Sequence, residues 1–308
     1  MDEDPKSLWK EIPPPSDAPY QTPDTDSTIL SDITGHTLAI VSRRGREHAH
    51  RGTFRDDSFA CKWLAETGWL IVAVSDGAGS APFSRAGSRI ACETFVARLT
   101  EKLASREANA KIDALTDKDT QGAALKRLLL DTLNKSSLTI QDEAKAKEVQ
   151  TKDYAATFLG YIAKRFGDEW LFCSVGIGDG AIGIIDKDGG LHLMNEPDGG
   201  EYVGQTRFIT MPEVWQNPDR HAHCIRMNGF RFVMSMTDGV SDPKFETDNN
   251  LRDAAKWTTL GDEILPMLQT ATPPEERLHQ LLNWLAFYSP GYHDDRTLSV
   301  LFEEPQHA

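Results

Sequence analysis

The segment Trp69–Ala81, WLIVAVSDGAGSA, runs from an unbroken apolar stretch straight into an Asp-Gly pair. The apolar stretch predicts a buried β-strand, and glycine permits the chain to leave that strand sharply. Similar phrases occur at Val175, VGIGDGAIG, and at Val233, VMSMTDGVSD. A single Asp-Gly pair is typical of a turn. Three apolar strands that each end in an aspartate indicate instead that several carboxylates meet at one edge of the fold.

The composition is that of a soluble globular protein, with 308 residues, 39% hydrophobic residues and 26% charged residues. A net charge of −14 argues against nucleic acid or an anionic membrane as the main partner. Apolar runs stay well short of the roughly 20 residues that cross a bilayer. The four cysteines have no CxxC spacing, so the sequence predicts neither a disulfide framework nor a zinc site, and it favours a cytoplasmic location.

The first 34 residues are rich in proline, aspartate, serine and threonine, which predicts a disordered N-terminal tail. A single domain is expected over residues 35–304. Within it, the segment 196–228 has little periodicity and two glycine-rich turns, and is interpreted as a flap-like insertion at the surface.

Short strands and a few longer helices are predicted along this domain. The strands are expected at 36–43, 57–64, 69–75, 157–165, 169–177, 181–186, 230–236 and 297–302. Apolar residues at steps of three and four predict helices over 84–104 and 123–149 and near 275–289.

The order of these elements favours an α+β fold. Most connections between strands are too short for a parallel crossover, so neighbouring strands should be antiparallel. The sequence therefore predicts a four-layer α/β-β/α sandwich, in which two antiparallel sheets pack together and helices flank them. A doubly wound parallel sheet is the alternative, and it fits less well because the strands cluster rather than alternate with helices.

Two further acidic pairs lie at strand ends. Asp56 and Asp57 open one predicted strand, and Asp294 and Asp295 precede the last one. Carboxylates gathered within a few ångströms repel by roughly 4 kcal/mol per close pair at an effective dielectric near 20, so such a cluster requires cations. Oxygen ligands select hard ions such as Mg²⁺ or Mn²⁺, and a pair of these ions can activate water for attack on a phosphoryl group.

Taken together, these motifs resemble those of the metal-dependent Ser/Thr protein phosphatases of type 2C, the PPM family, in a divergent bacterial-like branch. The motifs are RDDSF at 55–59, DGAGSA at 76–81, GDG at 178–180, TDGVSD at 237–242 and HDDRTLSVL at 293–301. The resemblance implies a hydrolase that removes phosphate from phosphoserine or phosphothreonine in proteins, by direct attack of a water or hydroxide that bridges two metal ions.

The resemblance also implies the metal ligands, for two or three Mn²⁺ or Mg²⁺ ions. Asp76 would bridge two ions, and the backbone carbonyl of Gly77 would bind one of them. Asp238 and Asp294 would bind the second ion, and Asp179 together with Asp238 would bind a third.

Other acidic residues are implied around these ligands. Asp56 replaces the glutamate usual in the family and would hold a metal-bound water, while Asp57 would orient another water. Asp295 stands where the family often has asparagine, and is expected to orient its loop rather than bind metal.

The chain departs from the family at the arginine that binds phosphate, because Gly52 stands at that position. Arg51 or Arg55 could supply the positive charge instead, and an arginine fork suits phosphate well. The alternative interpretation of Arg55 is a solvated residue at a strand end.

A second departure concerns the histidine that acts as an acid in eukaryotic members, which is Ala78 here. His48 and His293 are the candidates to protonate the leaving group, and a metal-bound water is the alternative.

The expected partners are a phosphoprotein substrate and a cognate kinase, with the chain itself a monomer. A catalytically weak pseudophosphatase, acting as a phosphoprotein-binding or regulatory module, is the alternative function. A calcium-stabilised interaction domain is a further alternative, although calcium sites often use consecutive acidic residues of one loop. The absence of a GxxxxGK[ST] motif argues against a P-loop nucleotidase.

Overall fold

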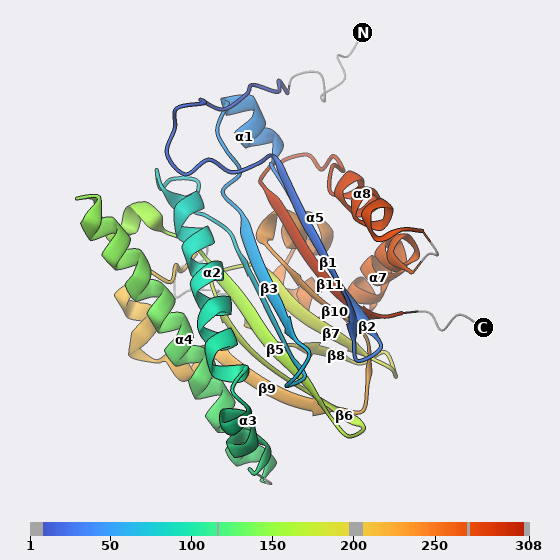
Figure 1. Ribbon diagram of the computed structural model, residues 1–308. Coiled ribbons are helices and arrows are strands. Elements are labelled where there is room, and N and C mark those ends of the chain that lie inside the picture. Colours follow the sequence, from blue (N-terminus) through green and yellow to red (C-terminus); the bar gives the residue numbers. More distant parts are fainter. Residues whose placement is uncertain (1–8, 116, 197–205, 270–271, 305–308) are drawn as a thin grey trace.

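The structure, a computed structural model, describes residues 9–115, 117–196, 206–269 and 272–304 (Figure 1). Its strands form two sheets in which every neighbouring pair is antiparallel. The six-stranded sheet has the order β1 (Thr25–Ile33), β2 (His36–Arg43), β11 (Arg296–Glu303), β10 (Phe230–Met236), β7 (Ala181–Asp186) and β8 (Leu191–Leu193). The five-stranded sheet has the order β3 (Ser58–Leu64), β4 (Trp69–Ser75), β5 (Phe158–Phe166), β6 (Glu169–Ile177) and β9 (Ala222–Met227).

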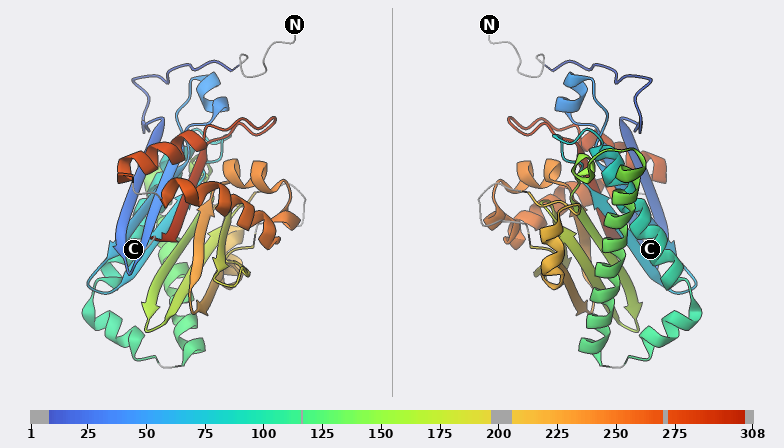
Figure 2. Two further views of the ribbon diagram at one scale, coloured as in Figure 1. Left: turned by 90° about the vertical axis from the view of Figure 1, so that its right-hand side faces the viewer. Right: turned by 90° about the vertical axis from the view of Figure 1, so that its left-hand side faces the viewer.

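Helices cover the outer face of each sheet, as the views in Figures 1 and 2 show. On the five-stranded sheet lie α2 (Ser84–Leu103), α3 (Arg106–Asp113) and α4 (Lys118–Ala146). Against the six-stranded sheet lie α5 (Asp238–Phe245), α6 (Asp248–Leu251), α7 (Ala254–Leu268) and α8 (Pro274–Trp284). The short helix α1 (Arg46–Arg51) joins β2 to β3 at one end of the sandwich.

The side chains of β4 show how the layers are held together. Leu70, Val72 and Val74 pack into the core between the sheets. The alternate residues Ile71 and Ala73 pack into the core beneath α2 and α4. Both faces of the strand are therefore buried, which explains its continuous apolar sequence. The predicted four-layer α+β sandwich is confirmed.

The prediction of a disordered tail over residues 1–34 is wrong for part of its length. Thr25–Ile33 form β1, which pairs with β2 at the edge of the six-stranded sheet. Before it, the chain is held by its backbone and side chains, with Ile12 donating to the carbonyl of Ala49 at 2.8 Å and Tyr20 Oη bonded to Glu143. Polar composition concealed this segment because an edge strand leaves many side chains in solvent. Residues 1–8 lie outside the described residues.

The segment 196–228 also contains more regular structure than predicted. Residues 222–227 are β9, which pairs with β6 and completes the five-stranded sheet. Two short 3₁₀ turns, Pro212–Gln216 and Pro218–His221, precede it. The remainder of the predicted flap, 197–205, lies outside the described residues.

The pairing of β6 with β9 also corrects the expectation that the cysteines are free of disulfides. Cys173 and Cys224 are directly opposite in the register of these strands, and they form a disulfide. A cross-strand neighbour separated by 51 residues is not visible as a spacing motif. In the described part of the chain, no helix has the length and apolar character needed to cross a membrane.

Candidate active site

Three of the predicted aspartates meet at one end of the sandwich. Asp76 follows β4, Asp179 lies in the turn between β6 and β7, and Asp238 begins α5, separated by one residue from the end of β10. Each offers a carboxylate oxygen, and these oxygens lie within 4.8 Å of one another. All three side chains are partly exposed, so a cation can enter from solvent.

The electrostatics of this cluster are unfavourable for bare carboxylates. Burial, followed by the charges of Asp238, Asp57 and Asp294, raises the pKa of Asp76 well above its usual range. Burial also raises the pKa of Asp238, with the charges of Asp179 and Asp294 adding to the effect. A cluster that holds its protons this strongly is one that a divalent cation would stabilise.

Asp57 lies next to Asp76 and is held by Thr237, which precedes α5, and by Thr297 of β11. Its Oδ2 accepts hydrogen bonds from Thr237 Oγ1 at 2.8 Å and Thr297 Oγ1 at 2.6 Å. Its Oδ1 is buried and has no N–H or hydroxyl donor among the described residues, and the carboxyl group of Asp57 lies within hydrogen-bonding distance of that of Asp76. Burial, then the charge of Asp295, raises the pKa of Asp57 to about 7. Because Oδ1 lacks a neutral donor, it could accept a hydrogen bond from a water or a substrate group.

Asp295 connects three segments of the chain. Its Oδ1 accepts from the backbone N–H of Gly45 at 2.6 Å, and its Oδ2 accepts from that of Asp56 at 2.5 Å. The imidazole Nδ1 of His48 lies 2.9 Å from the same Oδ2. The side chain of Asp295 has no exposed surface. These contacts fit the orienting role that the family resemblance implied for it.

His48 and Asp56 lie beside each other in this arrangement. His48 Nε2 is 3.8 Å from Asp56 Oδ2, which also accepts from Ser84 Oγ at 2.8 Å. Burial alone would lower the pKa of His48, but the hydrogen bond and charge of Asp295 raise it to about 9. Burial raises the pKa of Asp56 to about 6, against the charge of His48. At neutral pH His48 is therefore a cation next to an anionic pair.

The backbone at Gly77 explains why this position needs glycine. A Cβ there would lie 2.8 Å from the carbonyl carbon of Ser84 and 2.9 Å from the carbonyl oxygen of Asp56. The neighbouring backbone is fixed by Thr157, whose Oγ1 accepts from Asp76 N at 3.0 Å and whose N–H donates to Asp76 O at 2.8 Å. The strand end is therefore held rigidly where Asp76 leaves it.

Two predicted substrate-binding residues make contacts elsewhere. Arg51 is exposed and pairs with Glu47 on its own helix. Arg55 is 3% exposed, and its Nη2 lies 3.6 Å from Asp26 Oδ2 on β1. Within the described part of the chain, Arg51 and Arg55 therefore form ion pairs with Glu47 and Asp26, and not with Asp76, Asp179 or Asp238.

Two further predicted residues, His293 and Asp294, lie just before β11. Asp294 is exposed at the rim of the site, where it lies with His48 and Asp295 in a second group of potential ligands. His293 contacts the rings of Trp9 and Tyr288. Burial, followed by the charges of nearby arginines, lowers the pKa of His293.

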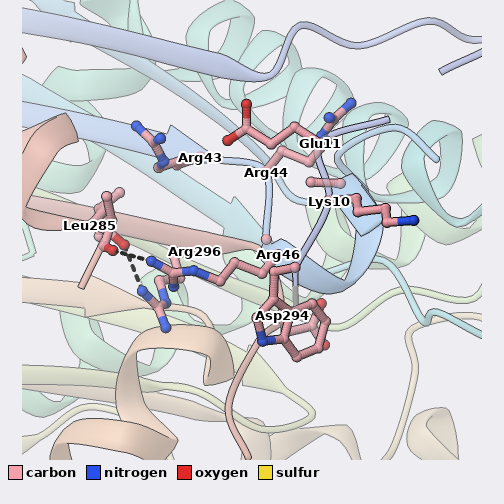
Figure 3. A pocket seen from close by; sticks show the side chains of 12 residues that line it. Lys10, Glu11, Arg43, Arg44, Arg46, Leu285, Asp294 and Arg296 are labelled. Carbon is pink, nitrogen blue, oxygen red and sulfur yellow. Dashed lines mark hydrogen bonds between the residues drawn. The ribbon is translucent and has the colours of Figure 1, made fainter. Parts of the chain in front are cut away.

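A group of arginines next to Asp294 was not predicted from the sequence. Arg43, Arg46 and Arg296 line a pocket of about 190 Å³ whose wall includes Asp294 (Figure 3). The signals that could have found them are the run RRGR at 43–46 and the arginine that ends HDDR at 293–296. Only the pairing of β2 with β11 brings these two stretches together.

Comparisons with known proteins identify the family to which the sequence is similar. The family described as protein phosphatase 2C matches residues 44–286. Serine/threonine-protein phosphatase 3 of Escherichia coli (strain K12) is 32% identical over 184 residues, which cover 58% of this chain and 62% of that protein. The match therefore spans less than two thirds of that relative.

Solved structures show the same fold at low sequence identity. The serine/threonine phosphatase Stp1 from Staphylococcus aureus matches with a TM-score of 0.52 and 11% identity, covering 87% of this chain and 95% of that one. A bacterial serine phosphatase matches with a TM-score of 0.50 and 12% identity, covering 88% and 99%.

Proposed function

The chain belongs to the protein phosphatase 2C family, and we propose that it is a metal-dependent serine/threonine protein phosphatase that hydrolyses phosphomonoesters. One observation carries this proposal. Carboxylates of Asp76, which follows β4, of Asp179 in the β6–β7 turn and of Asp238 in α5 converge within 4.8 Å, although burial and their mutual repulsion disfavour that arrangement without cations. The name of the Escherichia coli relative points to the same activity.

The donor set fits Mn²⁺ or Mg²⁺, because all of its ligand atoms are oxygens and the buried Oδ1 of Asp238 accepts no hydrogen bond from the described residues. The ions would be held by Asp76, Asp238, Asp179 and Asp294, with the carbonyl of Gly77 and water held by Asp56. Bound divalent ions would lower the pKa of water and offset the charge of the phosphoryl oxygens.

The residues of the chain itself supply position and charge. Asp57, fixed by Thr237 and Thr297, would accept a hydrogen bond from the attacking nucleophile at Oδ1, which has no N–H or hydroxyl donor among the described residues. The carboxylate of Asp295 accepts a hydrogen bond from the backbone N–H of Asp56, and it raises the pKa of His48. His48 lies against Asp56 and, as a cation, would offset negative charge near the substrate.

The proposal is tested by phosphate release from p-nitrophenyl phosphate and from a phosphothreonine peptide, with Mn²⁺ or with EDTA. Hydrolysis should require the metal, and Asp238→Asn should reduce kcat/KM by about 100-fold or more, because it removes a ligand charge from the site. Asp168→Asn, which changes an exposed aspartate outside the site, is the control and should match the unchanged protein.

Equal hydrolysis in the presence of EDTA would refute a metal-dependent reaction. Tight Mn²⁺ binding without turnover of either substrate would favour a pseudophosphatase that binds phosphoproteins.

A further inference from the structure

The pocket beside Asp294 concentrates positive charge in a chain of net charge −14. Arg43 ends β2 and Arg296 begins β11, and the two are directly opposite each other in the antiparallel register. Arg46, the first residue of α1, lines the same pocket (Figure 3). Like charges directly opposite on neighbouring strands are destabilising, so this arrangement is not explained by stability of the sheet.

Neutral carbonyl groups hold two of these arginines in place. Arg46 donates to the carbonyls of Phe287 at 3.0 Å and Ala286 at 2.6 Å. Arg296, which is 4% exposed, donates from Nε, Nη1 and Nη2 to backbone carbonyls, those of Gly239, Leu285, Phe287 and Tyr292, so it contributes charge to the pocket rather than a free fork. The carbonyls of Leu285, Ala286 and Phe287 follow the C-terminal end of α8, where the helix dipole favours a cation. The guanidinium groups are therefore positioned without being neutralised by a carboxylate.

Nearby ion pairs do not neutralise the positive charge of Arg43, Arg46 and Arg296. Arg44 also lines the pocket, but its Nη1 is 2.9 Å from Asp24 Oδ1. In contrast, no carboxylate of a described residue lies within 4.0 Å of a guanidinium nitrogen of Arg43, Arg46 or Arg296. Burial, followed by the charge of Arg43, lowers the pKa of Arg46.

Two carboxylates line the pocket at its borders. Asp294 forms a group of potential ligands with His48 and Asp295, and its charge also raises the pKa of Asp76 and of Asp238, so the pocket borders the candidate active site. Glu11 lies on the N-terminal segment, is exposed, and attracts Arg46. An anion that enters the pocket would thus lie beside Asp294, which is proposed above to hold a metal ion, and would compete with Glu11 for the arginines.

We propose that this pocket receives an anionic side chain of the phosphoprotein substrate, either aspartate, glutamate or a second phosphorylated residue, close to the residue that is dephosphorylated. This inference rests on the proposed function and adds a substrate preference to it. Arginine forks bind carboxylate and phosphate oxygens in pairs, and Arg43 lines the pocket without a carboxylate partner among the described residues. The enzyme would therefore favour phosphosites in acidic sequence.

The test compares two phosphothreonine peptides that differ only in glutamate or glutamine at the three positions on either side. The glutamate peptide should have the higher kcat/KM, by about tenfold, as expected for one partly desolvated arginine–carboxylate pair. Arg43→Gln should reduce this ratio to about twofold, and Arg43→Lys should give an intermediate value because it keeps the charge but loses the fork. Glu11→Gln should raise the ratio.

Arg127→Gln is the matched control, because Arg127 is an exposed arginine on α4 and its loss changes the net charge equally. Binding of both peptides to the Asp76→Asn variant, measured by fluorescence anisotropy, reads the same preference without turnover, so the result does not depend on phosphatase activity. An unchanged ratio in Arg43→Gln, or an equal drop in Arg127→Gln, would overturn the proposal. A third outcome would also overturn it: inorganic phosphate inhibits Arg43→Gln less than it inhibits the unchanged protein, while the preference between the two peptides stays the same. That outcome would identify the pocket as a site for small anions.

Discussion

At the scale of single residues, the Asp295 carboxylate ties α1, the start of β3 and the start of β11 together beneath the acidic site. It accepts from the backbone of Gly45 and Asp56 and contacts His48. An amide can accept with its oxygen alone, so substitution would direct an NH₂ group at a backbone donor. His48 would also lose its counter-charge.

We therefore expect Asp295→Asn to reduce the free energy of unfolding by about 2–4 kcal/mol, the cost of unsatisfied buried polar groups and a broken buried ion pair. Urea denaturation in EDTA measures this without a contribution from metal. Asp168→Asn, at an exposed position, is the control and should change the value by less than about 0.5 kcal/mol. A loss as small as this in Asp295→Asn would contradict the role assigned to the side chain.

Asp76 should behave in the opposite way. Asp76→Asn should abolish most activity, by about 100-fold or more, yet increase the free energy of unfolding in EDTA by about 1–2 kcal/mol at pH 7.5, because it removes a repelled charge. Thermal unfolding with and without Mn²⁺ checks both aspects, since the stabilisation by Mn²⁺ should shrink in the variant. If the variant is less stable than the unchanged protein in EDTA, repulsion between the carboxylates does not destabilise the metal-free protein, and the interpretation of the cluster is wrong.

At the scale of secondary-structure elements, the apolar strands and their acidic ends were predictable because β4, β6 and β10 are buried and read as continuous apolar runs. The edge strands β1 and β9 were not, because each leaves part of its surface in solvent and carries polar residues. The disulfide between Cys173 and Cys224 was hidden for the same reason, as it depends on the register of β9.

The candidate site divides in a similar way. The meeting of Asp76, Asp179 and Asp238 could be anticipated from strand ends. The threonine contacts to Asp57 and the pairing of Arg43 with Arg296 depend on register between strands far apart in sequence. No local pattern carries that information, which is why those residues became visible only in the structure.

The contact between α2 and the turn before β5 gives a prediction at this scale. A Cβ at Gly87 of α2 would lie 2.0 Å from the backbone oxygen of Tyr154, which cannot move as a side chain does. Gly87→Ala should therefore reduce the free energy of unfolding by about 2–4 kcal/mol. Gly122→Ala on α4 is the matched control, because its Cβ would meet Cys224 at an ordinary 3.7 Å and alanine favours a helix by up to about 1 kcal/mol. Chemical denaturation separates the two, and equal effects would contradict the packing described.

At the scale of the whole molecule, the buried titratable groups of the candidate active site make the stability depend on pH. The pKa of Asp56 is raised by burial to about 6, that of Asp57 to about 7, and that of His48, despite burial, to about 9 by Asp295. All three groups bind protons more tightly when folded. Their contribution to stability is complete below the unfolded pKa values and is lost as pH rises through the folded ones.

The metal-free protein should therefore lose at least about 2 kcal/mol of its free energy of unfolding between pH 5 and pH 9, because a tenfold difference in proton affinity between the folded and unfolded states is worth roughly 1.4 kcal/mol. Mn²⁺ should raise the melting temperature more at pH 8 than at pH 5.5, since metal and protons compete for the carboxylates. Denaturation across this range in EDTA and in Mn²⁺ tests both. Metal-free stability that increases steadily with pH would contradict the assignment.

The central claim, that these strand ends form a divalent metal site, is tested most directly by a crystal grown with Mn²⁺ and measured at the manganese absorption edge. We predict anomalous difference peaks from at least two ions per chain, with Asp76 and Asp238 among the ligands, and their loss in crystals of Asp76→Asn. A structure in which Asp76, Asp179 and Asp238 lie together under saturating Mn²⁺ with no such peak between them would contradict it.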